Sequence, residues 1–584
     1  MINLLTHGEK TRMSLGANIN EKANLIWAIA DKLTGVYKPH EYGEVILPLT
    51  VIRRFDCVLA DTRDAVRAKD AEAKHVAMKD VLLRKASGFS FYNVSKFTFE
   101  KLLDDPNNIE ANFRDYLAGF SQNVRDIIEK FKFDGHISTM AVKDILYIVL
   151  KEFTQPWANF HPDKISNLEM GYVFEEIIRR FSEAHNEDAG QHYTPREVIE
   201  LMVNILFLDD NAILSGANIA KTLYDPACGT GGMLSVAEDY LRRLNAGAEL
   251  LCFGQELNDQ TFAICKADML IKGSNADYIK DGNTLSDDKF AGRGFDYILS
   301  NPPFGREWKN EKGAVEKESR LGFAGRFGAG LPSASDGQML FLQTAVAKMK
   351  SGGSRVAIIH NGSPLFTGDA GSGPSEIRKY ILEKDLLEAV IALPNDIFYN
   401  TGIATYIWVL SNKKPAARKG KVQLINANGL YEKRRKALGS KRNDIPQSAV
   451  DEITRVYGAF QENEISKIFD TEDFGFSKIT VERPLRDAHG NPILKKGKPQ
   501  PDTGLRDTEN VPLKEDIGEY FKREVLPFAP DAWIDESKIK VGYEIPFTRY
   551  FYKYEAPKPS AEIMAEILEI EKELDGALTE VFGK

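Results

Sequence analysis

Four consecutive residues, Asn301, Pro302, Pro303 and Phe304, combine groups that could hold and activate an amine. The two prolines fix the backbone and remove two N–H donors, so carbonyl oxygens face an open site without competing donors. The side-chain oxygen of Asn301 and the carbonyl oxygen of Pro302 can then accept hydrogen bonds from one amino group. An aryl amine held in this way favours a pyramidal nitrogen, whose lone pair can attack a methyl group, and Phe304 can stack on a base rotated out of a duplex. A purely structural Asn-Pro-Pro turn is the alternative.

A glycine-rich segment at residues 225–233, DPACGTGGM, directly follows a short apolar run. Its glycines allow the backbone to turn sharply and to approach a ligand without a Cβ atom in the way. The helix that follows offers free N–H groups to a carboxylate or another anion. The segment is not the GxGxxG of dinucleotide sites, and no GxxxxGK[ST] phosphate loop occurs in the chain. A tight turn without a ligand is the alternative for this segment alone.

Two acidic residues end the next two strand-like segments. Glu256 ends LLCFGQE, where its carboxylate can accept hydrogen bonds from both hydroxyls of a ribose. Together with the glycine-rich segment, Glu256 suggests a cofactor that contains adenosine. Asp281 ends YIKD, and its carboxylate could meet the exocyclic amine of a bound adenine. For Asp281, a plain turn residue is an equally good interpretation.

The elements that must position these residues follow an alternating pattern. After about residue 168, short apolar runs that end in Asp, Asn or Gly alternate with helical stretches. This alternation predicts an α/β fold with a doubly wound, mostly parallel sheet and helices on both faces. Ligands of such sheets bind at the carboxyl ends of the strands, so the chemistry is expected there.

The two ends of the chain have a different character. Residues from about 20 to 165 show helical periodicity with few β-branched runs, which predicts a helical N-terminal domain. Residues 481–512 are rich in Pro, Gly and charge, and we expect an irregular excursion. Near the C-terminus, apolar residues recur at steps of four and three, as in a coiled-coil seam: Ile563, Ile567, Ile570, Leu574, Leu578 and Val581. Such a helix binds a partner or docks on its own domain.

Composition limits the class of protein. The chain has 584 residues, of which 43% are hydrophobic, and no apolar run of 18 residues, so a membrane span is not expected. The four cysteines form no CxxC pair, so neither zinc nor a disulfide framework is indicated, and a reducing cytoplasmic setting is expected. The net charge of -9 is poor for holding DNA unaided. Basic runs at 413–421 and 433–442 could touch phosphates, although a solvated charged face is the commoner meaning of such runs.

These motifs, in this order, carry a resemblance. DPACGTGG, Glu256 and NPPF resemble an S-adenosylmethionine-dependent DNA adenine-N6 methyltransferase, and QHYTPREV at 191–198, upstream of the glycine-rich segment, is similar to the gamma order of these enzymes. The chain more closely resembles the modification subunit of type I restriction–modification systems. This closer resemblance rests also on KPHEYGEVILPLTVIRRFDCVL (38–59), YEKRRKALGSKRND (431–444) and VGYEIPFTRYFY (541–552), and it covers nearly the whole chain from about residue 19.

The resemblance implies a fold, a reaction and a set of site residues. The fold is a helical N-terminal domain, a Rossmann-like S-adenosylmethionine-dependent methyltransferase domain and a C-terminal helical tail. The reaction is direct in-line methyl transfer to the N6 amine of a flipped adenine, without a metal. The target base should be held by Asn301, Pro302, Pro303 and Phe304. The cofactor should be held by Gln191, His192, Tyr193, Thr194, Pro195 and Arg196 at its methionine part, by Asp225, Gly229, Thr230 and Gly231 at its amino-acid end, and by Glu256 and Asp281 at its adenosine.

The resemblance also implies partners and a division into domains. Two modification subunits flank one specificity subunit, which reads double-stranded DNA, and a restriction or translocase subunit completes the complex. The chain lacks a phosphate loop, so it is not the translocase itself. We expect a disordered extension at 1–18, a helical domain at 19–165, the catalytic domain at 166–480, an irregular C-terminal segment at 481–558 and a partner-binding helix at 559–584.

Two other functions compete with this interpretation. Asn-Pro-Pro-aromatic motifs also hold the amines of protein glutamine and of RNA bases, but the long helical N-terminal domain and the terminal stripe speak against a small stand-alone enzyme. A catalytically idle scaffold is the second rival. Intact Asp225, Glu256 and Asn301 argue against it.

Overall fold

The computed structural model describes residues 28–73, 76, 78–183, 194–399, 401–495, 497–552 and 559–582, without the side chains of 181–183, 573 and 575–582. The expected extension at 1–18 and the site residues Gln191, His192 and Tyr193 lie outside the described residues. The chain divides into two compact units, Met1–Ile545 and Pro546–Lys584, which are described in turn.

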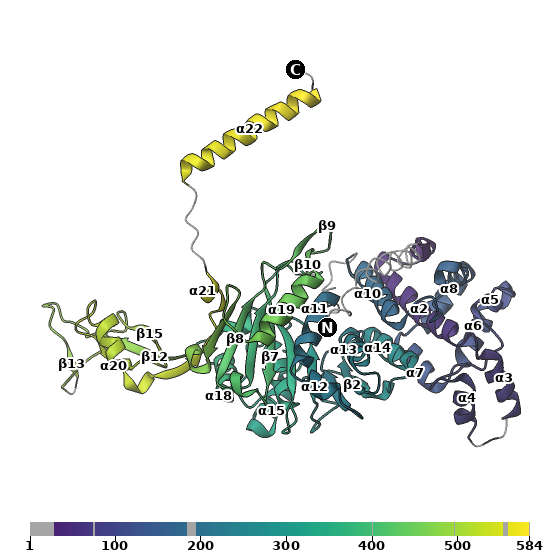
Figure 1. The fold of residues 1–584 in the computed structure, drawn as a ribbon, viewed down its shortest axis with the longest axis horizontal. Coiled ribbons are helices and arrows are strands. Elements are labelled where there is room, and N and C mark those ends of the chain that lie inside the picture. The colour runs from purple at the N-terminus through teal and green to yellow at the C-terminus, as the bar shows by residue number, and fades with distance from the viewer. Residues whose placement is uncertain are drawn as a thin grey trace. The chain divides into compact units, whose positions relative to one another are not determined.

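Helices make up the N-terminal part of the first unit, as the sequence predicted (Figure 1). Almost every residue of α2 (Tyr42–Val58) is buried, including Arg54, which donates to the carbonyl oxygen of Ile165 at 3.1 Å. A partnered guanidinium is the usual condition for burying such a charge. The other helices here are η2 (Pro39–Glu41), α3 (Arg63–Glu72), α4 (Lys79–Ser87), α5 (Phe99–Leu102), η3 (Pro106–Asn108), α6 (Ile109–Ala118), α7 (Gln122–Lys130), α8 (Asp134–Val142), α9 (Leu146–Glu152), η4 (Pro156–Ala158) and α10 (Asn167–Glu183).

A nine-stranded sheet forms the centre of the first unit, in the order β11-β8-β6-β7-β5-β4-β1-β2-β3. Its strands are β1 (Ala220–Asp225), β2 (Glu249–Glu256), β3 (Ile279–Asp281), β4 (Tyr297–Ser300), β5 (Arg355–Asn361), β6 (Leu387–Ala392), β7 (Thr405–Ser411), β8 (Lys421–Asn426) and β11 (Ser466–Asp470). Neighbours from β3 to β5 are parallel, whereas β7 runs antiparallel between β5 and β6. No helix occurs among the described residues between β6 and β7, 393–399 and 401–404, and a parallel pair would need such a crossover.

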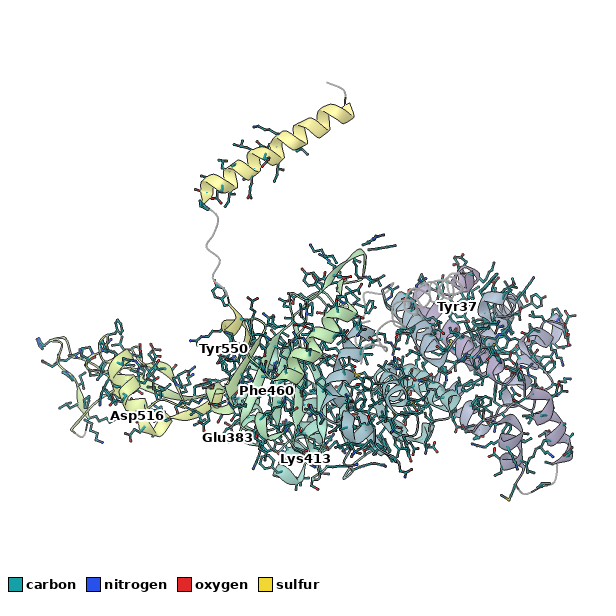
Figure 2. All side chains as sticks on the ribbon, viewed as in Figure 1. Tyr37, Glu383, Lys413, Phe460, Asp516 and Tyr550 are labelled. Atoms are coloured by element: carbon teal, nitrogen blue, oxygen red, sulfur yellow. The ribbon has the colours of Figure 1, made fainter. Side chains whose placement is uncertain are left out.

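Strands β4, β6 and β7 are buried along their whole length, and a strand buried throughout has no solvent-facing side. Helices therefore cover the sheet on both faces. Side chains fill the space between these layers (Figure 2). The helices are α11 (Arg196–Leu208), α12 (Asn211–Leu214), α13 (Gly232–Leu244), α14 (Asp259–Lys272), η6 (Ala276–Tyr278), α15 (Lys312–Ser319), η7 (Gly322–Ala324), α16 (Gln338–Ala347), α17 (Ser363–Phe366), α18 (Gly373–Glu383), η8 (Ala416–Arg418) and α19 (Gln447–Ala459). The prediction of a helical domain followed by a doubly wound, mostly parallel sheet is confirmed.

Two smaller sheets accompany the large one. A hairpin of β9 (Glu432–Leu438) and β10 (Lys441–Asp444) stands apart from the nine strands. An antiparallel sheet follows, made of β12 (Gly475–Glu482), β15 (Asp507–Pro512), β16 (Trp533–Ile534) and β17 (Lys540–Tyr543), with η9 (Thr471–Phe474), α20 (Ile517–Tyr520), η10 (Phe521–Val525) and η11 (Glu536–Lys538). The segment 481–512 therefore begins and ends as paired strands, and only its middle, with β13 (Leu494–Lys495) and β14 (Lys498–Pro499), is the expected excursion.

The second unit holds α21 (Phe547–Phe551) and α22 (Ser560–Phe582). The apolar stripe expected at 559–584 lies on α22, where Ile563, Ile567, Ile570 and Leu574 are exposed. The side chains of Leu578 and Val581 lie outside the described residues. None of the helices in the described ranges is both long and apolar enough to cross a membrane.

Candidate active site

The glycine-rich loop connects the end of β1 at Asp225 to the start of α13 at Gly232. Gly229 and Gly231 have φ angles of 53° and 83°, in the left-handed region that favours glycine. A Cβ atom on Gly231 would also lie 2.7 Å from the sulfur of Cys265 on α14. Glycine is thus required for both the backbone conformation and the packing of this loop.

The carboxylate of Glu256, the last residue of β2, accepts hydrogen bonds from the segments that follow β1 and β2. Its Oε2 accepts a hydrogen bond from the N–H of Gly229 and its Oε1 accepts one from the N–H of Asn258, both at 2.8 Å. The residue is 8% exposed. Each carboxylate oxygen has a second lone pair, so both oxygens can still accept from a ligand hydroxyl.

Asp225 is a buried carboxyl at the end of β1. Its Oδ1 accepts hydrogen bonds from the Ser300 hydroxyl at 2.8 Å and from the N–H of Ala227 at 3.0 Å. Burial raises the pKa of Asp225 to about 7, and these two hydrogen bonds offset only part of that effect. Asp225 therefore keeps its proton to a higher pH than an exposed Asp, and a cation bound beside it would favour the carboxylate.

One cavity brings together predicted site residues from three segments of the chain. Its lining includes Thr194, Asp225, Gly229, Thr230 and Asn301, together with Glu175, Ile199, Ala227, Cys228, Gly232 and Met233. The carboxyl ends of β1 and β4 meet here because these strands are parallel neighbours. The sequence-based grouping of the glycine-rich loop with Asn301 corresponds to one place in the fold.

Asn301 is held by a residue from the segment before α11. Its Nδ2 donates to the hydroxyl of Thr194 at 2.8 Å. Its Oδ1 is buried and has no hydrogen-bond partner among the described residues. Buried polar atoms are normally paired, so an orphaned acceptor in a cavity is a place where a ligand donor would bind.

The rest of the Asn-Pro-Pro-Phe motif separates two cavities. Pro302 is buried, and Pro303 lines the second cavity, whereas Asn301 lines the first. Phe304 is half-buried and meets the Phe398 ring edge-on, at 6.0 Å between ring centroids. The four residues therefore contact different surroundings, although they are adjacent in sequence.

Arg196 and Glu175 form a buried ion pair beneath the first cavity. Arg196 Nη2 lies 2.5 Å from Glu175 Oε1, and the guanidinium also stacks over the Tyr172 ring at 4.4 Å. Burial raises the pKa of Glu175, and Arg196 opposes that shift. Arg196 begins α11 directly after Pro195, so the pair ties α10 to the start of α11.

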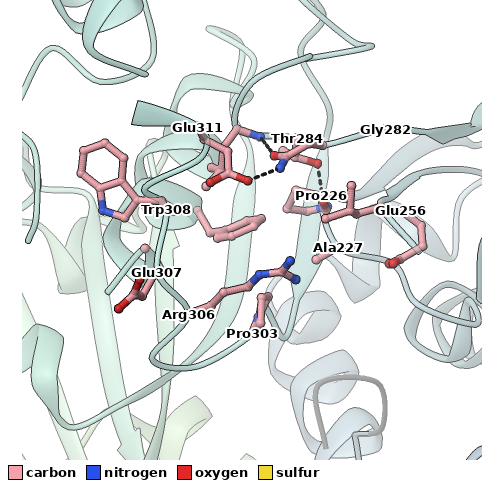
Figure 3. A pocket seen from close by; sticks show the side chains of 15 residues that line it. Pro226, Ala227, Glu256, Gly282, Thr284, Pro303, Arg306, Glu307, Trp308 and Glu311 are labelled. Carbon is pink, nitrogen blue, oxygen red and sulfur yellow. Dashed lines mark hydrogen bonds between the residues drawn. The ribbon is translucent and has the colours of Figure 1, made fainter. Parts of the chain in front are cut away.

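The second cavity lies beyond Glu256 (Figure 3). It is lined by Pro226, Ala227, Glu256, Leu257, Gly282, Asn283, Thr284, Leu285, Pro303, Arg306, Glu307, Trp308, Glu311, Gly337 and Phe341. Asn283 Nδ2 donates to Glu311 Oε1 at 2.6 Å, and the Thr284 hydroxyl donates to the carbonyl oxygen of Pro226 at 2.5 Å. Apolar walls with a few polar groups are typical of a small-molecule site.

Asp281 does not line either of these cavities. Its carboxylate pairs with Lys130, at the end of α7, and this hydrogen bond holds the pKa of Asp281 below its usual value. Lys130 also lies 3.3 Å from Asp259. Beyond the end of β3, the residues that line the second cavity are Gly282, Asn283, Thr284 and Leu285, and Asn283 lies two positions after Asp281.

Comparison with protein families identifies the family to which the chain belongs. The sequence model of the family described as N-6 DNA Methylase matches residues 166–482, which include the glycine-rich loop, Glu256 and Asn301. The chain belongs to this N-6 DNA methylase family. The model of the HsdM N-terminal domain matches residues 22–153, the helical part of the first unit. The predicted membership among type I modification subunits, and with it a DNA adenine methyltransferase, is confirmed.

Relatives of this N-6 DNA methylase include the methylase subunits of two type I restriction enzymes from Methanocaldococcus jannaschii. That of MjaIX is 25% identical over 486 residues, which cover 79% of this chain and 81% of the relative. That of MjaVII is 28% identical over 62% of this chain and 60% of the relative. The crystal structure of the type I restriction-modification methyltransferase subunit from Streptococcus thermophilus has a TM-score of 0.60 at 20% identity and covers 78% of this chain and 97% of its own, which supports the fold.

Glu175 and Asn283 are among the cavity residues of this methylase that the sequence analysis did not predict. Glu175 lies inside the helix α10, without a motif, and only its burial against Arg196 and the first cavity distinguishes it. Asn283 lies two residues after Asp281. The chain changes direction at Gly282 between them, where φ is 131°, so the two side chains have different surroundings. In the described ranges, no cluster of three or more His, Cys, Asp or Glu side chains could hold a metal ion, and all four cysteines are buried without a disulfide.

Proposed function

We propose that this chain transfers a methyl group from S-adenosylmethionine to the N6 amine of an adenine in double-stranded DNA, as the modification subunit of a type I complex. One observation carries the proposal: the Oδ1 of Asn301 is an orphaned acceptor inside a cavity that also holds Asp225 and the glycine-rich loop. This acceptor lacks a hydrogen-bond donor, and the amine of the target adenine would supply one.

The two cavities suit the two ends of the cofactor. We assign the methionine end to the first cavity, where Asp225 and Glu175 provide carboxylates for cationic groups. We assign the adenosine end to the second cavity, where Glu256 would accept from the ribose hydroxyls and Asn283, instead of Asp281, would contact the adenine. Gln191, His192 and Tyr193 are proposed to contribute from the segment before Thr194.

The chain's own residues position the target base. Asn301 Oδ1 and the Pro302 carbonyl oxygen would accept the two hydrogens of the amine, and Phe304 would stack on the base. Thr194 keeps the amide of Asn301 oriented, because it accepts from Nδ2 and so leaves Oδ1 for the substrate. S-adenosylmethionine supplies an electrophilic methyl group on a sulfonium. Positioning the two reactants at contact distance supplies much of the acceleration, and the amine proton leaves afterwards to solvent.

The partners follow from the same proposal. The chain would act with a specificity subunit that reads the DNA sequence, two modification subunits to one specificity subunit, and with a restriction subunit. The exposed stripe Ile563, Ile567, Ile570 and Leu574 of α22 supports a packing partner for this helix, because such a stripe is a coiled-coil seam. We keep 19–165, 166–480, 481–558 and 559–584 as the proposed functional division.

The deciding experiment compares Asn301→Ala with Asn112→Ala, a control on α6, in the complex with the co-expressed specificity subunit. Labelled methyl transfer to duplex DNA, RNA and protein is measured, together with cofactor affinity by calorimetry. We expect Asn301→Ala to abolish transfer to DNA while cofactor binding survives. Activity within about tenfold of the unmodified chain, about 1.4 kcal/mol of barrier, would refute the role of Asn301. Transfer by the unmodified chain to RNA or protein instead of DNA would favour the rival substrates.

A further inference from the structure

The β9–β10 hairpin carries a concentration of positive charge that the proposed catalytic machinery does not use. Lys433, Arg435, Lys436 and Arg442 are exposed. None of these four side chains makes an ion pair with a residue that the structure describes. The hairpin's other cations are paired: Arg434 with Asp444, and Lys441 with Glu197. In a chain of net charge -9, this is a local excess of cations on one projecting arm.

A wide bulge shapes the charged strand. Lys441 pairs with Leu438 and Asn443 pairs with Lys433, so residues 434–437 of β9 lie opposite Arg442 alone. Extra residues on one strand bend it and turn its side chains to new directions. Arg435 and Lys436 are in this bulged segment, where no ladder partner restricts them.

Strand β10, beginning next to the turn of the hairpin, is fixed to the loop that follows β6. The buried Lys441 ammonium donates to the carbonyl oxygen of Ile397 at 3.1 Å. The N–H of Arg442 donates to the carbonyl oxygen of Asp396 at 2.8 Å, and Asn443 Nδ2 donates to the carbonyl oxygen of Asn395 at 2.9 Å. Strand β10 therefore lies against the loop 395–399.

That loop leads directly to the candidate active site. Phe398 meets the ring of Phe304, the last residue of the Asn-Pro-Pro-Phe motif. Lys441 also pairs with Glu197 in the first turn of α11, close in sequence to Thr194, which orients Asn301. Strand β10 thus contacts both the first turn of α11 and the loop whose Phe398 meets Phe304.

We propose that the β9–β10 hairpin binds the phosphate backbone of double-stranded DNA beside the base that enters the active site. This inference rests on the proposed function, in which the chain acts on duplex DNA. Lys433 to Lys436 span at most about 10 Å, the length of a regular strand at about 3.3 Å per residue. Over that length one DNA strand presents about three phosphates, one every ~3.4 Å of helix axis. Contacts to phosphate position a protein without reading sequence, which suits a subunit that leaves recognition to a partner.

The test measures how the DNA affinity of the complex with the specificity subunit depends on salt. The hairpin variant is K433Q/R435Q/K436Q. The control, K85Q/K101Q/K143Q, removes three exposed lysines of the N-terminal helical part. Fluorescence anisotropy with a duplex that contains the methylation site gives the slope of log affinity against log salt. Calorimetry with S-adenosylmethionine confirms that each variant is folded.

Each phosphate contact contributes about 0.9 to the slope, so the hairpin variant should lose about 2.7. Between 50 and 200 mM salt, the advantage of the unmodified complex should then shrink about 40-fold. The charge-conserving variant K433R/R435K/K436R should keep the full slope, and the control should too. The methylation rate at saturating DNA should be unchanged in the hairpin variant.

Two results would overturn the proposal. The first is a slope for the hairpin variant equal to that of the control, in a complex that binds and methylates DNA. The second is failure of the hairpin variant to assemble with the specificity subunit, which would make the hairpin a protein-binding surface. An unmodified complex that neither binds nor methylates DNA would instead refute the proposed function, so the two failures are distinguishable.

Discussion

The buried carboxyl of Asp225 makes stability depend on pH in a defined way. Its pKa is raised by burial from 3.8 to about 7. Between these two values the unfolded chain is ionised at this position while the folded chain keeps its proton, so the folded state becomes less stable as pH rises. Above the pKa of Asp225 in the folded state, the loss of folding stability caused by this carboxyl is complete and constant. Asp225→Asn removes the titration and keeps an oxygen for the Ser300 hydroxyl and the Ala227 N–H.

The size of the effect follows from the shift. One pKa unit corresponds to 1.36 kcal/mol, so the full penalty at high pH is about 4 kcal/mol. From pH 5 to pH 8, the free energy of unfolding of Asp225→Asn should rise by about 2.5 kcal/mol relative to the unmodified chain. Most of that change falls below pH 7. The carboxyl of the folded chain ionises near pH 7, and above that pH both states are ionised and the difference stops growing.

The assay is urea unfolding of both proteins at several pH values without cofactor. Asp296→Asn is the matched control. Burial raises the pKa of Asp296, but hydrogen bonds from Lys350 and Thr222 outweigh it and leave the pKa lowered. Asp296 is then ionised in both states from pH 5 to pH 8, so its variant should differ from the unmodified chain by a constant amount. A constant difference for Asp225→Asn as well would refute the reasoning.

Three further predictions concern ligands and assembly. Glu256→Gln should weaken cofactor binding about tenfold or more, because the amide nitrogen cannot accept a hydrogen bond from a ribose hydroxyl, and an unpaired buried polar group costs about 1–3 kcal/mol; unchanged affinity by calorimetry would contradict this. Thr194→Val should lower the methylation rate by a similar factor because Asn301 loses its acceptor, while Thr194→Ser should restore it; equal rates for the two variants would exclude an orienting hydroxyl. Removal of residues after Pro559 should leave a folded, cofactor-binding protein that no longer assembles or methylates specifically, as size-exclusion chromatography and a methylation assay would show; unaltered assembly would place the partner surface elsewhere.

The expected sheet was largely predictable because its signals are local. Apolar runs that end in Asp, Asn or Gly correspond to β1, β2 and β4. The antiparallel course of β7 was not predictable in this way, because a strand has the same local pattern whichever direction it runs. Strands β12 and β15 were also missed. They pair with each other although they are distant in sequence, and the Pro, Gly and charged residues around them are typical of irregular segments.

By itself the sequence determined the contiguous motifs, because Gly and Pro dictate backbone conformation wherever they stand. The glycine-rich loop and the Asn-Pro-Pro-Phe turn are of this kind. Only the tertiary structure decided what each side chain meets. Thr194 and Asn301 are 107 residues apart, and Lys130 and Asp281 are 151 apart, yet each pair is in hydrogen-bond contact. The burial of Asp225 and the contacts of the cationic hairpin are likewise set by which elements lie next to each other in the fold. The pKa of a group and its hydrogen bonds depend on neighbours in space and not on neighbours in sequence.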